Sequence, residues 1–280
     1  MSTDADQANR EAWSRAASGW ERWQESLRAA TAPVSKWMVD AIDPQPGETV
    51  LELAAGPGET GFIAAQRLGS SGRLISTDQS PEMVEVARRR AGELALENVE
   101  FAVVDAQRPG LEPASADAVL CRFGYMLMAE PDTALAQTRE ILRPGGRLAL
   151  ATWDTPDQNL WMATSAMQMI ARGVLPMPEP GAPGPFAMAD PEALTDRLRA
   201  AGFRDARAER IGLQQRYESF DVFWQQTMGL AAPLASALAK LDGEEVGEIR
   251  DAVHDALSSF EAADGSMEMP GRAIGAAARV

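Results

Sequence analysis

The stretch LELAAGPGETG, residues 51–61, constrains the fold of this chain more than any other segment. It carries Gly56, Gly58 and Gly61 in the spacing G-x-G-x-x-G, directly after a short apolar run. A glycine-rich loop between a strand and a helix is typical of sheets that bind adenosine-containing cofactors. Dinucleotides and other adenosine cofactors both bind to such loops. The residues around the glycines must therefore indicate which of the two classes of cofactor binds here.

Short apolar runs alternate with amphipathic segments after residue 48. We expect strands over 49–53, 73–77, 99–104, 116–121 and 147–153, and helices over 59–69, 81–94 and 131–142. Strands that alternate with helices of ten to fifteen residues indicate βαβ units and a mostly parallel sheet. The sequence therefore predicts an α/β fold, a Rossmann-like doubly wound sheet whose ligand lies beyond the carboxyl ends of the strands.

The segments before and after this core are expected to be largely helical. Apolar residues recur every three or four positions over 8–30, and a second helix is expected from Pro33 to Ile42, with Pro33 in its first turn. The pattern predicts three regions: an N-terminal helical lid over 1–43, a core over 44–155, and a C-terminal part over 156–280. The last part is expected to complete the sheet and to hold helical insertions at 156–190 and 220–262.

Composition excludes several classes of protein. The net charge is −15, which opposes binding to a nucleic-acid backbone, and the basic run Arg88–Arg90 is read as complementing a helix dipole. One cysteine excludes an intramolecular disulfide framework and a cysteine-rich zinc site. No apolar stretch approaches the ~18 residues of a membrane span. With the polar, acidic N-terminus, this predicts a cytoplasmic protein without a signal peptide.

Charges around the glycine loop favour a cationic cofactor. Glu52 ends the first expected strand and Glu59 opens the following helix, an unfavourable arrangement for a pyrophosphate. S-adenosylmethionine carries a sulfonium and an ammonium group, which suit an acidic pocket. Asp78 ends the second strand, where a carboxylate can accept both ribose hydroxyls, and Asp105 ends the third, within reach of an adenine amine. An NAD(P)-dependent oxidoreductase remains the alternative, because Asp78 serves either cofactor.

Five motifs in this order resemble the class I S-adenosylmethionine-dependent methyltransferases. They are VLELAAGPGETG, STDQSPEMVEVARRRA, VEFAVVDAQ, DAVLCRFGYMLM and REILRPGGRLALATW. The similarity covers roughly residues 45–155 and is greatest to the ubiquinone/menaquinone and secondary-metabolism enzymes that act on small molecules. It implies a seven-stranded sheet with an antiparallel C-terminal hairpin, and S-adenosylmethionine as cofactor with S-adenosylhomocysteine as product.

The resemblance also assigns roles to residues of the cofactor site. Glu52 and the backbone near Ala54 hold the methionine end, and Asp78 binds the ribose. Arg122 and Phe123 are expected beneath the sulfonium, facing the acceptor. Ala54 replaces the family's first loop glycine and is expected to keep a negative φ and tighten the loop. The complete predicted set is Glu52, Ala54, Gly56, Gly58, Asp78, Gln79, Met83, Asp105, Ala106, Arg122 and Phe123.

Methyl transfer is an in-line displacement that depends mainly on placing the acceptor and excluding water. The sequence offers no clear general base, so the catalytic residue is unknown, with Arg122 and Tyr125 as candidates. His254 is remote from the motifs and Cys121 is expected to be a core residue. No Asp-Pro-Pro-Tyr element follows the fourth strand, which argues against a nucleic-acid acceptor. No carboxylate cluster indicates a metal site.

Tryptophan and methionine in the flanking segments indicate an apolar pocket for a planar or greasy acceptor. The candidates for binding it are Trp20, Trp23, Tyr125, Trp153 and Trp161. The first helix is either a lid or a dimer interface, so a monomer and a homodimer both remain open. Three functions are weighed: a small-molecule O- or C-methyltransferase, the oxidoreductase, and a cofactor-binding protein without turnover.

Overall fold

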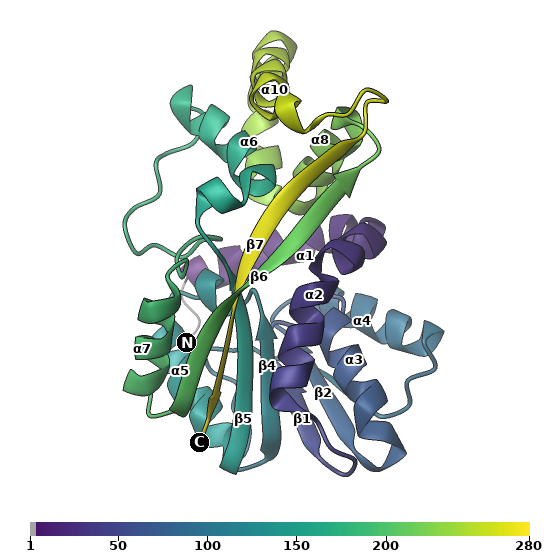
Figure 1. Ribbon diagram of the computed structural model, residues 1–280, viewed down its shortest axis with the longest axis vertical. Coiled ribbons are helices and arrows are strands. Elements are labelled where there is room, and N and C mark those ends of the chain that lie inside the picture. Colours follow the sequence, from purple (N-terminus) through teal and green to yellow (C-terminus); the bar gives the residue numbers. More distant parts are fainter. Residues whose placement is uncertain (1–3) are drawn as a thin grey trace. The chain divides into compact units, whose positions relative to one another are not determined.

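A mixed seven-stranded sheet organises the protein (Figure 1). The computed structural model describes residues 4–280, except for the side chains of residues 4–9 and 12. The strands lie in the order β3-β2-β1-β4-β5-β7-β6. Their bounds are β1 Thr49–Glu52, β2 Arg73–Asp78, β3 Val99–Val103, β4 Ala116–Arg122, β5 Leu142–Trp153, β6 Arg204–Tyr217 and β7 Met267–Arg279. The predicted Rossmann-like fold with its antiparallel C-terminal hairpin is confirmed.

The first five strands are parallel, and β7 pairs antiparallel with β5. Parallel strands place their carboxyl ends at one edge of the sheet, so polar residues that end separate strands are brought close together. Strand β1 is buried along its whole length, because helices cover both faces of a parallel sheet. Helices α3 and α4 pack on β1, β2 and β3, and α5 packs on β5.

The helices begin where the sequence provides caps. Ser80 accepts the Met83 N–H ahead of α4, whose first residue is Pro81, and Asp190 and Ser219 cap α7 and α8 in the same way. None of the helices among the described residues has the length and apolar character needed to cross a membrane. Their bounds are α1 Asp4–Arg22, α2 Gln24–Ile42, α3 Glu59–Leu68, α4 Pro81–Glu93, α5 Pro131–Ile141, α6 Leu160–Ala171, α7 Pro191–Ala200, α8 Phe220–Leu230, α9 Ala232–Leu238 and α10 Gly243–Leu257.

Two local predictions were wrong. The N-terminal helices divide near Trp23 instead of at residues 31–32, and Pro33 lies inside α2 instead of in its first turn. Burial of Val34, Met38 and Val39 on the core side outweighs the hydrogen bond that the proline cannot make. The fifth strand was expected over 147–153, but β5 already begins at Leu142, which pairs with Ala116 beside a bulge.

The chain forms two compact units. The first comprises residues 1–30, 155–182 and 212–272, and the second comprises residues 31–154, 183–211 and 273–280. The second unit holds the parallel strands, the glycine loop and the carboxyl ends of β1 to β5. Helix α2 and the strands β6 and β7 contribute residues to both units, while the boundaries after residues 154 and 182 lie in loops.

Candidate functional site

Polar side chains meet at the carboxyl ends of β1, β2 and β4 in the second unit. Glu52 is the last residue of β1, where it pairs in register with Ser76 of β2 and Leu120 of β4. Asp78 lies two positions beyond Ser76, and Arg122 lies two positions beyond Leu120. The topology therefore brings Glu52 together with an acid 26 positions and a guanidinium 70 positions further along the sequence.

Glu52 is a buried acid with one oxygen left unpaired. Its Oε1 accepts the Gly61 N–H of α3 at 2.8 Å, while Oε2 is buried and has no hydrogen-bond partner. A Cβ on Gly61 would lie 2.2 Å from Oε2, so only glycine leaves room for this carboxyl group. Burial raises the pKa of Glu52 to about 8, against the lowering effects of the Gly61 N–H and Arg122. An unpaired buried carboxyl group is suited to receive a cationic group of a ligand.

The glycine loop has a left-handed backbone at Ala54, with φ of 50°, so the prediction of a negative φ there is wrong. The strand-end bonds that fix Leu53 and Ala55 on either side of it, to Leu120 O and Thr77 O, hold it in that conformation. Left-handed backbone at alanine costs about 1 kcal/mol. Gly124 accommodates the methyl group, because a Cβ there would approach the Ala54 Cβ to 2.8 Å.

Asp78 holds the glycine loop through both carboxylate oxygens. Its Oδ2 accepts the Gly56 N–H and its Oδ1 accepts the Ser80 N–H, each at 2.9 Å. At Gly56 an added Cβ would meet nothing within 4 Å, so open space lies beside the loop here. Each oxygen retains a lone pair, so the carboxylate can still accept further hydroxyl donors. Of its predicted neighbours, Gln79 is partly exposed and Met83 is buried beneath the cap of α4.

Asp105 follows β3 in a turn of its own. Its Oδ1 accepts the Gln107 N–H at 2.9 Å, and Ala106 between them is buried. Gln107 then accepts the Glu130 N–H through its side chain, which ties this turn to the start of α5. The turn fixes the direction of Asp105, whose Oδ2 accepts no hydrogen bond from the described residues.

Glu59 differs from Glu52 because its charge is countered. It forms a buried ion pair with Arg90, the last arginine of the basic run, although its Oε2 has no hydrogen-bond partner. Arg90 also lies in the last turn of α4, the position predicted to complement the helix dipole. Its ion pair with Glu59 in addition connects α4 to α3. Among the described residues, Glu52 and Asp78 are therefore the acids of this loop that form no ion pair.

Arg122 is half-buried and is held by hydroxyl groups of helix α2. Its Nη1 donates to the hydroxyls of Thr31 and Ser35 on α2, and Ser35 is hydrogen-bonded to Thr60 in the first turn of α3. Burial lowers the pKa of Arg122, and the negative charges of Glu59 and Glu52 partly restore it. The hydroxyls were missed from the sequence, since serine and threonine on an amphipathic helix give no signal of pairing with a distant arginine.

Phe123 and Trp153 come together at the ends of neighbouring strands. Their rings stack with centroids 3.9 Å apart and an interplanar angle of 12°. Tyr125 is placed differently, because it is buried and its hydroxyl lies 2.6 Å from that of Thr138 on α5. We therefore do not propose a direct contact between Tyr125 and an acceptor. The Cys121 thiol is also buried, which raises its pKa to about 12 and makes it unreactive.

The remaining aromatic candidates lie in the first unit. Trp20 stacks edge-on against Trp13 with its Nε1 buried and unpartnered, and Trp23 lies beneath the Arg22 guanidinium. The Trp161 Nε1 donates to Asn159 Oδ1, which anchors the start of α6. The five predicted acceptor residues are thus split between the two units. In the same unit, the His254 ring stacks on Phe220 and pairs with Glu261.

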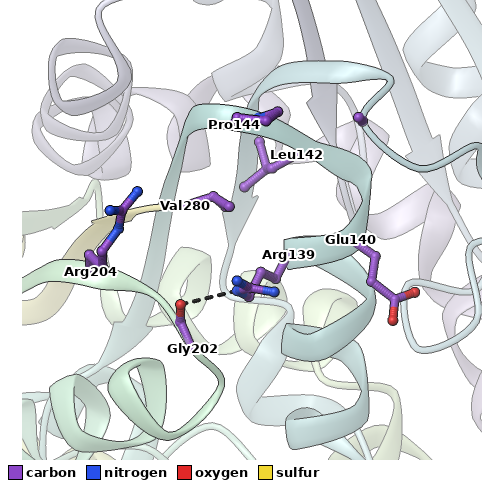
Figure 2. A pocket seen from close by; sticks show the side chains of 8 residues that line it. Arg139, Glu140, Leu142, Pro144, Gly202, Arg204 and Val280 are labelled. Carbon is purple, nitrogen blue, oxygen red and sulfur yellow. Dashed lines mark hydrogen bonds between the residues drawn. The ribbon is translucent and has the colours of Figure 1, made fainter.

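One hollow of about 570 Å³ lies at the other end of the sheet (Figure 2). It borders Leu142 at the start of β5, and Arg139 closes one side by donating to Gly202 O at 3.0 Å. Ligands of doubly wound sheets bind at the carboxyl ends of the strands, whereas this hollow faces the amino ends of β4 and β5. We therefore do not assign the cofactor to it.

The buried acids predict a measurable pH dependence. Because the pKa of Glu52 is raised on folding, its neutral form stabilises the protein at low pH and this contribution is lost as the pH rises through about 8. The free energy of unfolding of the ligand-free protein should fall by about 2–4 kcal/mol between pH 5 and pH 8. Denaturant unfolding at both pH values measures it.

Glu52→Gln is the matched variant for this measurement. It keeps the shape of the side chain but cannot ionise, so the fall in the free energy of unfolding between pH 5 and pH 8 should be reduced by half or more. Burial also raises the pKa of Asp78, so the free energy of unfolding of Glu52→Gln should still fall with rising pH, by a smaller amount. A pH dependence of equal size in wild type and Glu52→Gln would rule out Glu52 as the titrating group.

Known proteins resemble this chain over its central region. Residues 44–202 match the family model described as a methyltransferase domain. Nocamycin O-methyltransferase from Saccharothrix syringae is 29% identical over 71% of this chain and 75% of its own length. Aklanonic acid methyltransferase from Streptomyces sp. strain C5 is 36% identical over 43% of this chain and 54% of its own. A 42% identical transposon protein of Streptomyces fradiae is matched over 34% of its length, so the chain spans a third to a half of these two relatives.

A solved structure shares the arrangement of elements. The YcgJ protein from Bacillus subtilis superimposes with a TM-score of 0.59 and 18% identity, covering 88% of this chain and 97% of that one. At this identity the likeness concerns the fold alone. It places the β3-β2-β1-β4-β5-β7-β6 sheet among known architectures, while the family match rests on the sequence of residues 44–202.

Proposed function

Because the chain belongs to the methyltransferase family, we propose that it transfers a methyl group from S-adenosylmethionine to a small apolar or aromatic acceptor. The observation that carries the proposal is the set of acids at successive strand ends around a glycine loop. Glu52 has an unpaired buried oxygen, and open space lies beside Gly56. A cofactor with two cationic groups and no phosphate fits such an environment.

Three carboxylates of the second unit would hold the cofactor. Glu52 would receive the ammonium of the methionine end, Asp78 would accept from the ribose hydroxyls, and Asp105 would accept from the adenine amine. When bound, S-adenosylmethionine supplies a methyl group that is already activated by its sulfonium. Asp78 is oriented for its role by the Gly56 and Ser80 N–H groups, so binding need not reorganise the loop.

The remaining task of the protein is to position the acceptor and exclude water. Phe123 is partly exposed and stacks on the buried Trp153, so its ring presents aromatic surface at the end of β4, where a planar acceptor can pack. We propose O- or C-methylation; the nocamycin relative is named an O-methyltransferase. The described side chains near the loop include no histidine, so acceptors that ionise readily are favoured over those that need a general base.

Transfer of a labelled methyl group tests this function. The protein is incubated with S-adenosylmethionine labelled in the methyl group and with a panel of phenols, quinones and polyketide-like acceptors. Label should appear in at least one acceptor, together with S-adenosylhomocysteine. Binding of the cofactor without transfer to any acceptor would favour a binding protein, and release of S-adenosylhomocysteine without a labelled acceptor would indicate hydrolysis.

A further inference from the structure

A glutamine in the interior of the first unit has no hydrogen-bond partner. Gln215 lies on β6 and is 1% exposed, and its Nε2 donates to no group of the described residues. None of the described residues donates to its Oε1 either. Buried amides are normally hydrogen-bonded, because removal from water is costly unless another group replaces the solvent. Gln215 is therefore an interior polar group whose partner is not supplied by the described part of the chain.

Tyr217 shows the same feature two residues further along β6. Alternate residues of this part of the strand are buried, so Leu213, Gln215 and Tyr217 share its inner face. Tyr217 is 5% exposed, and its ring packs edge-on against Phe223 of α8 with centroids 5.2 Å apart. Its hydroxyl forms no hydrogen bond with the described residues, and burial alone raises its pKa. An amide and a phenol, both without partners, are thus neighbours on one buried face.

Helix α6 brings a third such group to this interior. Trp161 of α6 and Leu213 of β6 both lie against Gly271 of β7. A Cβ on Gly271 would come within 2.8 Å of Trp161 Nε1 and 2.5 Å of Leu213 Cδ1. Ser165 lies one turn beyond Trp161 on the same face of α6, and its Oγ is buried without a hydrogen-bond partner among the described residues. A serine inside a helix can bond the carbonyl group four residues earlier, but Ser165 does not.

These three side chains suit a ligand that carries oxygen atoms on an apolar or aromatic body. The amide of Gln215 donates through Nε2, and the hydroxyls of Tyr217 and Ser165 can donate or accept, so together they can bind carbonyl and hydroxyl oxygens. Their surroundings are apolar, since Phe223 and Met269 are buried in the same unit. None of the three groups carries a charge, which favours a neutral oxygen over an ionised one.

We propose that Gln215 and Tyr217 bind carbonyl or hydroxyl oxygens of the methyl acceptor, with Ser165 as a third hydrogen-bonding group. Each unpartnered polar group would then gain its partner from one ligand. This inference rests on the proposed function and deepens it, because it identifies the acceptor as an oxygenated ring system and not a plain hydrocarbon. It makes Gln215 and Tyr217 specificity-determining residues.

The test compares two uncharged ligands that have the same ring skeleton and differ in two carbonyl oxygens. Titration followed by tryptophan fluorescence measures the affinity for 2-(hydroxymethyl)anthraquinone and for 2-(hydroxymethyl)anthracene, each in the presence of S-adenosylhomocysteine. The wild type should bind the quinone about 10-fold more tightly, which is the value of one to two neutral hydrogen bonds. This preference should fall to about threefold or less in Gln215→Met and in Tyr217→Phe, and to about one in the double variant.

Thermal unfolding of the ligand-free variants separates a ligand-binding role from a structural one. Gln215→Met replaces an unpartnered amide by an apolar side chain of similar shape, so the unfolding midpoint should stay equal or rise. Gln226→Met is the matched control, because Gln226 is also buried in the first unit but its Oε1 accepts from the Ser26 hydroxyl at 3.1 Å. This variant should lower the midpoint and keep the wild-type preference for the quinone.

The outcomes separate this inference from the proposed function. A wild type that binds the two ring systems equally, or binds neither, overturns the inference, and so does a preference that survives in the double variant. A midpoint that falls as far in Gln215→Met as in Gln226→Met makes Gln215 a structural residue and also overturns it. Tyr217→Phe, which removes one oxygen only, keeps the test decisive if Gln215→Met does not fold. A wild type that fails to bind S-adenosylhomocysteine in a separate titration contradicts the proposed function itself.

Discussion

Gly61→Ala should destabilise the protein by about 3 kcal/mol and remove binding of S-adenosylhomocysteine. The new methyl group would lie 2.2 Å from Glu52 Oε2 and 2.9 Å from the Leu74 side chain. Neither neighbour can retreat, because both Glu52 and Leu74 are buried in the sheet. The carboxyl group would be pushed away from the Gly61 N–H, leaving a buried donor and a buried acid unsatisfied. Denaturant unfolding and calorimetric titration measure the two effects.

Gly92→Ala is the matched control for this variant. Gly92 also lies inside a helix, but a Cβ there would meet nothing within 4 Å. The substitution should stabilise the protein by up to about 1 kcal/mol, because alanine restricts the unfolded chain and favours helix. In a Glu52→Ala background the cost of Gly61→Ala should shrink, since the clash is with that side chain. Equal costs in both backgrounds would show that the two residues are not coupled.

Asp78→Ala should weaken S-adenosylhomocysteine binding by about 100-fold or more. The substitution removes the expected ribose acceptor and also the two bonds that hold Gly56 and Ser80. Each hydrogen bond from a ribose hydroxyl to the charged carboxylate is worth about 1.5–3 kcal/mol, so the loss of two such bonds weakens binding by more than 100-fold. Titration at a fixed pH, with the fold checked by circular dichroism, gives the ratio directly.

Asp117→Ala serves as the control for a carboxylate that holds backbone. Asp117 accepts the Thr49 N–H at the other end of β1 and pairs with Arg143. Its removal should lower stability by about 1–2 kcal/mol and leave the affinity for S-adenosylhomocysteine within about twofold of wild type. If both aspartate variants lost affinity to the same degree, the effect of Asp78→Ala would reflect general destabilisation and not a place in the site.

The sheet was predictable because its signals are local. Apolar runs mark β1 to β4, Ser80 and Pro81 mark the start of α4, and the glycine spacing marks the loop. The closeness of Glu52 and Asp78 follows from these signals, because parallel strands bring their carboxyl ends together. The long β5 was predicted only in part, since Pro144 and the glycines after it are turn signals that pairing with β4 and β7 overrides.

The environment of the site was less predictable because it depends on contacts between distant segments. The Glu59–Arg90 pair and the bonds from Arg122 to Thr31 and Ser35 join residues 31 to 91 positions apart. The backbone conformation of Ala54 was predicted from the preference of alanine for negative φ, but the hydrogen bonds of its neighbours Leu53 and Ala55 determine that conformation. The sequence correctly predicted that the glycine loop is surrounded by acidic residues, but it did not predict the hydrogen-bond or ion-pair partner of each acid.

The most direct test of this account is parallel calorimetric titration of the purified protein with S-adenosylmethionine, S-adenosylhomocysteine and NAD. The acidic strand ends and the unpaired Glu52 oxygen predict that both sulfur nucleotides bind and that NAD does not. Because NAD carries a pyrophosphate, its binding in the absence of the other two would contradict the assignment of the loop to a cationic cofactor.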